Sequence, residues 1–283
     1  MQIIQTTKEM QDICLRHKQK SQSIGLVPTM GYLHAGHLSL VQKAREEHDI
    51  LVVSVFVNPT QFGVGEDFEV YPRDLSRDAA LLEEAKVDYC FAPSPEEMYP
   101  TGYATFVETE GEITHKLCGK SRPTHFKGVT TVVAKLFNIC QPDEAYFGQK
   151  DAQQVSVIEK MTRELNLPVR VRRMPIVRET DGLALSSRNI YLSPEDRAQA
   201  LVLSRSLQMA QDRVTAGERD ARALAKAVED MIHTSPLAQI DYVEIVNPED
   251  LTQAEVLTGP TLIALAVKFG STRLLDNIVL EVR

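Results

Sequence analysis

The sequence predicts an α/β protein with a Rossmann-like, doubly wound parallel sheet and a smaller C-terminal α+β domain. Short apolar runs alternate with helical patterns along the first part of the chain, which is typical of βαβ units. The run at residues 50–57 is almost continuously apolar and β-branched, as expected for a strand covered on both faces. Beyond residue 180 helices come first and strands follow, so the alternation has ended. We therefore predict domains at residues 1–180 and 181–283.

Composition and charge argue against a nucleic-acid-binding, membrane-spanning or secreted protein. The chain has 283 residues and a formal net charge of −8, which disfavours a general nucleic-acid surface. No apolar run reaches the ~18 residues of a membrane helix, and the first residues lack the pattern of a secretory signal. The four cysteines are widely spaced and form no Cys-x-x-Cys motif, so we expect buried or free thiols. We expect a soluble cytoplasmic protein without nucleic-acid or membrane partners.

The first half of the chain predicts alternating strands and helices. Thr6 and Glu9 form a capping-box pattern at the first helix, and Ser76 is the predicted cap of a later one. Residues 115–128 are rich in basic side chains and predict either a flexible loop that closes over an anion or a solvated basic loop. The elements expected here are helix 6–20, strand 24–27, a helix from 38 to about 47, strand 50–57, helix 76–85, strand 87–91 and a short strand at 105–108.

The second half begins with the clearest helical pattern, at residues 129–140, where apolar side chains fall on one face. Ser193 followed by Pro194 is typical of a helix start. The later elements expected are strand 145–147, helix 152–165, extended segments 169–171 and 175–177, helices 194–215 and 220–232, and strands 240–246, 261–267 and 278–282.

The segment at residues 28–37 is the first candidate site. It joins a buried strand to a helix through Gly31 and Gly36, and a helix start offers an anion unpaired N–H groups and a positive dipole end. His34 and His37 are three residues apart, so both can face the same spot from the first helical turn. This pattern favours polyphosphate binding; a zinc pair and plain capping residues are the alternatives.

Two further polar segments follow predicted strands. Asn58 and Gln61 have neutral amides that suit a hydroxyl or carboxylate ligand, although an ordinary Asn-Pro turn explains them equally well. Lys150 stands in a glycine-containing turn before a helix, and Gln154 lies one turn further on. Such a turn repeats the geometry of the first candidate site, so Lys150 is a candidate phosphate contact, with an ordinary surface lysine as the alternative.

A third polar segment holds two hydroxyls and a guanidinium in sequence, at Ser186, Ser187 and Arg188. These groups suit an oxyanion, because the planar guanidinium donates several hydrogen bonds at once. By itself the tripeptide is a weak signal, since most such tripeptides lie on protein surfaces.

Taken together, these segments resemble the pantothenate synthetase family. His34-Ala35-Gly36-His37 is similar to the His-x-Gly-His element of the wider superfamily of nucleotidylyltransferases and class I aminoacyl-tRNA synthetases. The family more often has Glu where this chain has Gln149, which changes a charge beside Lys150. The stretches that carry the resemblance are residues 28–37, 50–62, 122–128, 147–154 and 181–192.

The resemblance implies an ATP-dependent condensation of (R)-pantoate with β-alanine to pantothenate, AMP and pyrophosphate, through a pantoyl adenylate. It also implies Mg²⁺ arriving with ATP, with Asp78 as an indirect ligand, and a homodimer. The catalytic residues implied are His34, His37, Lys150 and Arg188. The ATP-binding residues implied are Met30, Gly31, Tyr32, Leu33, His34, Ala35, Gly36, His37, Gly148, Gln149, Lys150, Asp151, Val177, Leu185, Ser186, Ser187 and Arg188. The residues implied for pantoate and β-alanine are Gln61, Gln154, Asn58, Arg122 and His125.

Three other functions are alternatives to this one. A nucleotidylyltransferase acting on a phosphorylated acceptor would favour Lys or Arg where the chain has Gln61 and Gln154. A catalytically silent nucleotide-binding module would use the same phosphate segments without turnover. An RNA-binding synthetase relative is disfavoured by the negative net charge and the short C-terminal part.

Overall fold

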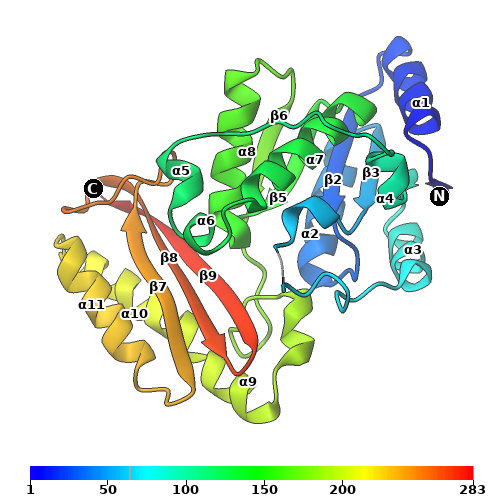
Figure 1. The fold of residues 1–283 in the computed structure, drawn as a ribbon. Helices are drawn as coiled ribbons and strands as arrows, with labels where there is room; N and C mark the ends of the chain where they lie inside the picture. Colours follow the sequence, from blue (N-terminus) through cyan, green and yellow to red (C-terminus); the bar gives the residue numbers. More distant parts are fainter. Residues whose placement is uncertain (64, 283) are drawn as a thin grey trace.

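The computed structural model describes residues 1–63 and 65–282, and they form two sheets with helices packed on them (Figure 1). The larger sheet is parallel and runs in the order β1-β4-β3-β2-β5-β6. Its strands are β1 Gln2–Ile4, β2 Ile24–Thr29, β3 Ile50–Val55, β4 Tyr89–Phe91, β5 Glu144–Gly148 and β6 Arg170–Met174. The smaller sheet is antiparallel and consists of β7 Ala238–Val246, β8 Gly259–Phe269 and β9 Thr272–Val282. The predicted fold class is confirmed, and the division at residue 180 stays a prediction.

The helices lie between and around these strands. None of those in the described part of the chain is long and apolar enough to cross a membrane. The longer helices are α1 Thr7–Gln19, α2 Ala35–Glu47, α3 Leu75–Glu84, α7 His125–Cys140, α8 Ala152–Glu164, α9 Pro194–Ala200, α10 Val202–Thr215 and α11 Ala221–Ile232. The short ones are η1 Pro59–Gln61, α4 Pro95–Met98, α5 Glu112–His115, α6 Cys118–Ser121, η2 Gln149–Asp151 and η3 Ser187–Tyr191.

The central strands β2 and β3 of the large sheet are buried on both faces, in agreement with their almost continuous apolar sequences. Along β2, Leu26 packs with α1, α7 and α8 on one face, whereas Val27 packs with α2 and α3 on the other. On the small sheet, α10 and α11 cover one face and form a separate core (Figure 1). The opposite face contributes Leu262 and Ala264 to a cluster with Ala152 of α8. Apolar packing therefore joins the two sheets.

Several helix ends differ from the sequence prediction. The helix expected from residue 38 begins at Ala35, because His34 caps it in place of the usual short polar residue. The prediction of Ser76 as a cap is wrong, since Asp74 accepts the hydrogen bond from Arg77 N at 3.0 Å. The helix expected at 194–215 is interrupted at Leu201, and β1 was missed.

Two loop predictions also differ from the structure. Residues 105–108 form no strand; Val107 bonds instead to the hydroxyls of Thr130 and Thr131 on α7. The basic segment 115–128 folds into α5, α6 and the first turn of α7 rather than a flexible loop. In both cases tertiary packing against α7 and α8 supplies the hydrogen bonds and burial that local sequence lacks. The four cysteines are free and buried, as predicted.

A close approach between η1 and α7 fixes the loop that follows β3. The Asn58 side chain donates to the Gly128 carbonyl at 3.1 Å. A Cβ placed on Gly128 would lie 2.3 Å from the Thr60 carbonyl oxygen, so only glycine fits here. This contact holds Asn58 and Gln61 against the start of α7.

We predict that Gly128→Ala lowers the free energy of unfolding by more than ~2 kcal/mol, because two backbone segments must move apart. The matched control is Gly148→Ala, where a Cβ meets nothing within 4 Å and φ is −75°. That substitution should be neutral or slightly stabilising. Urea unfolding of both variants measures the difference, and equal stabilities would contradict the close approach.

Candidate active site

A cavity of about 970 Å³ opens where β2, β3 and β5 end and the small sheet begins. Parallel strands end at the same edge, so the loops that follow them meet there. Most of the predicted site residues come together around this cavity, from segments far apart in sequence. The predicted residues in its lining are Met30, His34, Gly36, His37, Asn58, Gln61, Arg122, His125, Gly148, Lys150, Asp151, Gln154, Val177, Leu185, Ser186, Ser187 and Arg188.

The other predicted residues lie behind the lining. They are Gly31, Tyr32, Leu33, Ala35, Asp78 and Gln149. Gly31 and Tyr32 both have positive φ, 84° and 50°, and make the sharp turn after β2. Leu33 is fully buried in the core under α2. Gly31, Tyr32, Leu33, Ala35 and Asp78 shape the loop after β2 from behind the lining, whereas Gln149 lies in η2.

Asp78 of α3 holds this turn from below. Its two carboxylate oxygens accept the backbone N–H groups of Tyr32 at 2.7 Å and Leu33 at 2.8 Å. Burial raises the pKa of this carboxyl, although the two N–H donors and Arg77 oppose that shift. The implied role of Asp78 as an indirect Mg²⁺ ligand stays a prediction, whereas its bonds to the loop are direct. We assign Asp78 the role of a structural support.

The two histidines stack at the start of α2, with ring centroids 4.0 Å apart. The His34 Nδ1 accepts from the Gly36 N–H at 3.1 Å, and the His37 Nδ1 accepts from the His34 N–H at 3.4 Å. Each Nδ1 is therefore an acceptor, which leaves the proton of the neutral ring on Nε2. The backbone capping bonds thus select one tautomer for both rings.

Burial keeps both rings neutral. It lowers the pKa of His34 to about 4, with help from the Lys150 charge. It lowers the pKa of His37 to about 3, with further contributions from His34 and Lys150. At neutral pH the pair therefore offers N–H donors, and no positive charge, to an anion in the cavity.

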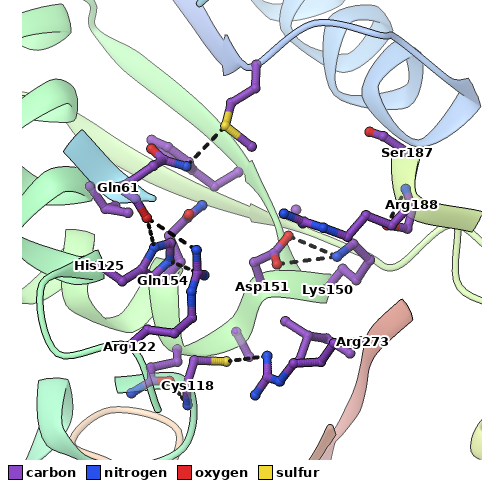
Figure 2. Close-up of a pocket in the computed structure, with 18 of the residues that line it drawn as sticks. Gln61, Cys118, Arg122, His125, Lys150, Asp151, Gln154, Ser187, Arg188 and Arg273 are labelled. Atoms are coloured by element: carbon purple, nitrogen blue, oxygen red, sulfur yellow. Dashed lines mark hydrogen bonds and ion pairs between the residues drawn. The ribbon is translucent and has the colours of Figure 1, made fainter. Parts of the chain in front are cut away.

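Three cations of the site are paired with carboxylates. Arg188 makes a bidentate pair with Asp67, with both N–O distances at 2.9 Å, and Arg122 pairs with Glu66. Lys150 contacts its neighbour Asp151 at 3.2 Å (Figure 2). Asp67 and Glu66 were missed in the sequence, because nothing local links residue 67 to a partner 121 positions away.

Neutral amides occupy another wall of the cavity. Asn58, itself buried, donates to the Gln61 Oε1 at 3.1 Å, which fixes the orientation of that amide. The Gln61 Nε2 then donates to the Met30 sulfur at 3.1 Å, which leaves its second N–H for a ligand. Gln154 faces the same cavity from α8 (Figure 2).

His125 supports this wall from the start of α7. Its Nδ1 lies 2.8 Å from the Gln61 carbonyl, so that nitrogen carries the proton. Its Nε2 then accepts from Arg122 at 3.2 Å. Burial, followed by the Arg122 charge, lowers the pKa of His125 to about 4. His125 and Arg122 therefore hold the backbone of Gln61 in place.

The depressed histidine pKa values predict a loss of stability in mild acid. The unfolded chain takes up protons on these side chains below pH ~6.5, whereas the folded chain does not until about pH 4, so the free energy of unfolding falls over this range. His37→Gln should reduce the slope against pH by up to ~1.4 kcal/mol per pH unit. Urea unfolding between pH 7 and 4.5 measures this, and an unchanged slope would refute the neutral-histidine assignment.

Comparison with known proteins identifies the family. A sequence model described as pantoate-beta-alanine ligase matches residues 2–279. The chain is 60% identical over 282 residues to a pantothenate synthetase of Syntrophomonas wolfei and 57% identical to one of Acetivibrio thermocellus, each covering 100% of both chains.

Solved structures agree with the sequence relatives. A pantothenate synthetase from Thermus thermophilus superimposes with a TM-score of 0.94 at 48% identity, covering 98% of this chain and 99% of that one. A pantoate-beta-alanine ligase from Francisella tularensis, complexed with beta-gamma ATP and beta-alanine, has a TM-score of 0.80 at 35% identity, covering 99% and 97%. With a continuous match over nearly its whole length, the chain belongs to the pantoate-beta-alanine ligase family.

Proposed function

We propose that this protein condenses (R)-pantoate with β-alanine, using ATP, and releases pantothenate, AMP and pyrophosphate. The observation that carries this proposal is one cavity with two chemically different walls. Lys150, Arg188 and the histidine pair supply donors suited to phosphates. Gln61 and Gln154 supply uncharged amides suited to the hydroxyls and carboxylate of pantoate. A phosphorylated acceptor would instead require cations on the second wall.

The nucleotide occupies the first wall in this proposal. Lys150, Ser186, Ser187 and Arg188 bind the phosphates, and the Nε2–H groups of His34 and His37 donate to them. Met30 and Gly36 lie along the nucleotide, while Asp151 and Val177 contact the adenosine. In the structure Asp67 pairs with Arg188, and Asp151 pairs with Lys150. When ATP binds, its phosphates would replace these carboxylates as partners of the two cations.

The reaction then needs two displacements and no covalent bond to the protein. A carboxylate oxygen of pantoate attacks the α-phosphorus, and the bond from that phosphorus to the bridging oxygen breaks, which releases pyrophosphate. The amine of β-alanine next attacks the acyl carbon, AMP leaves, and the amine loses a proton as the amide forms. Positioning and stabilisation of phosphate charge account for the catalysis. His37 acts as a hydrogen-bond donor to the developing charge, since its pKa of about 3 keeps it neutral.

Mg²⁺ is proposed to arrive with ATP and to neutralise phosphate charge. In residues 1–63 and 65–282 no group of three or more His, Cys, Asp or Glu side chains is arranged to hold a metal ion. Phosphate oxygens and water would therefore supply most of its ligands, which is the usual arrangement for this ion. The adenylate intermediate, the homodimer and the cytoplasmic location stay proposals that rest on family likeness.

We predict that labelled pyrophosphate exchanges into ATP when pantoate is present and β-alanine is absent. Exchange that requires pantoate follows directly from a reversible adenylation step. Release of pyrophosphate only when β-alanine is also added would indicate a concerted or strictly ordered path. Silence under both conditions would contradict the proposed function.

We predict that Gln154→Glu raises the KM for pantoate at least tenfold, because a carboxylate loses a donor and repels the substrate carboxylate. The KM for ATP should change by less than about threefold. Steady-state kinetics at saturating β-alanine separate the two constants. Gln211→Glu, the same change on an exposed face of α10, is the matched control. Equal effects on both KM values would argue against an amide wall for pantoate.

A further inference from the structure

Two adjacent residues of the small sheet reach the phosphate side of the cavity. Asp276 and Asn277 lie on β9 and are only 2% and 3% exposed. Both belong to the cavity lining, yet neither was expected from the sequence and neither has a part in the proposed reaction. Buried polar side chains are costly unless they are hydrogen-bonded, so their partners show what they hold in place.

Asn277 holds the turn that presents Lys150. Its Nδ2 donates to the backbone carbonyls of Gln149 at 3.0 Å and Lys150 at 2.9 Å. Its Oδ1 accepts from the Gln149 Nε2 at 3.2 Å. The last bond fixes the orientation of the Asn277 amide, so that its donors face the two carbonyls. An ionised Glu at position 149 has no hydrogen to donate and could not make this bond. The bond therefore explains why a Gln side chain suits this position.

Asp276 holds the hairpin that leads into the serine and arginine segment. Its carboxylate makes a bidentate pair with Arg178, at 2.6 and 2.9 Å. Arg178 also donates to the Gly182 carbonyl at 3.1 Å, and residues 178 and 184 form a β-bridge. The chain continues from this bridge directly into Leu185 and the Ser186–Arg188 segment.

The geometry of β9 explains how the adjacent residues Asp276 and Asn277 contact two different segments. Side chains alternate along a strand, and Leu274 packs in the core with α10 and α11 while Leu275 packs on the side of α8. Asp276 and Asn277 continue this alternation, and β9 is paired with β8 along its whole length. A rigid strand therefore fixes the distance between two turns that share no strand or helix.

We propose that Asp276 and Asn277 are positioning residues that hold the Lys150 turn and the Ser186–Arg188 segment at the spacing required by the phosphates of ATP. Lys and Arg side chains are long and flexible, so the point they reach depends on how firmly their backbone is held. The inference rests on the proposed function, since it assumes that both segments bind ATP.

The test is calorimetric titration of the full chain with MgATP, without pantoate. Asn277→Ala should weaken ATP binding about tenfold, as expected for losing the bonds that fix the Lys150 turn. Asn277→Asp keeps the size and the acceptor for Gln149 but turns an anion toward two carbonyls, so it should weaken binding at least as much. The titrated stoichiometry counts the folded molecules, so a loss of fold is not mistaken for a loss of affinity.

A double-mutant cycle distinguishes positioning from a general structural role. If Asn277 acts through Lys150, then Asn277→Ala should change the affinity of a Lys150→Ala chain by less than about twofold. Asp276→Asn should likewise weaken ATP binding, and this effect should shrink in an Arg188→Ala chain. A full tenfold loss in the Lys150→Ala background would overturn the proposal, as would wild-type affinity in Asn277→Ala.

Ser156→Ala is the matched control. Ser156 is buried on α8 and donates to the Pro248 carbonyl at 2.7 Å, so it also joins the helices of the large sheet to the C-terminal part. It touches neither phosphate segment, and its removal should leave ATP affinity within about twofold of wild type. A tenfold loss here would show that any contact between the two parts matters, and would overturn the specific role of β9. A wild-type chain that failed to bind ATP would overturn the proposed function and this inference together.

Discussion

The parallel pairing of β2 with β3 and β5 is the constraint on which the site depends. β2 pairs with β3 over its whole length and with β5 on its other side. Because the three strands run in the same direction, the loops that follow them emerge at one edge. Those loops carry the histidine pair, the Gln61 amide and Lys150. Without this common edge, no single cavity would receive groups from residues 34, 61 and 150.

Charge is balanced inside the cavity before any substrate enters. Arg188, Arg122 and Lys150 each have a carboxylate partner, whereas the two stacked histidines remain neutral through burial. An anionic ligand can exchange with the carboxylates while the histidine donors stay fixed by the backbone of α2. The site thus combines replaceable ion pairs with donors whose tautomer is set by helix capping.

Sequence patterns predicted the sheet and most of the cavity, but they misplaced two helix ends and one loop. The Asp74 cap of α3 and the start of α2 at Ala35 are matters of local hydrogen bonding that several residues could have satisfied. The Val107 segment was mistaken for a strand because its β-branched and aromatic residues favour one, whereas hydroxyls of α7 provide its partners. Asp78 holds the backbone of Leu33 and Tyr32, which lie 45 and 46 residues away, and no local pattern links it to them.

By itself the sequence determined the alternation of strands and helices, the histidine turn and the family resemblance. Each depends on short contiguous segments whose residues follow a defined period or spacing. Only the tertiary structure decided which charges meet. The pairs of Asp67 with Arg188, Asp276 with Arg178, and Asn277 with the Lys150 turn join residues 98 to 128 positions apart. Such contacts follow from the packing of segments that are distant in the chain, and no local pattern records that packing.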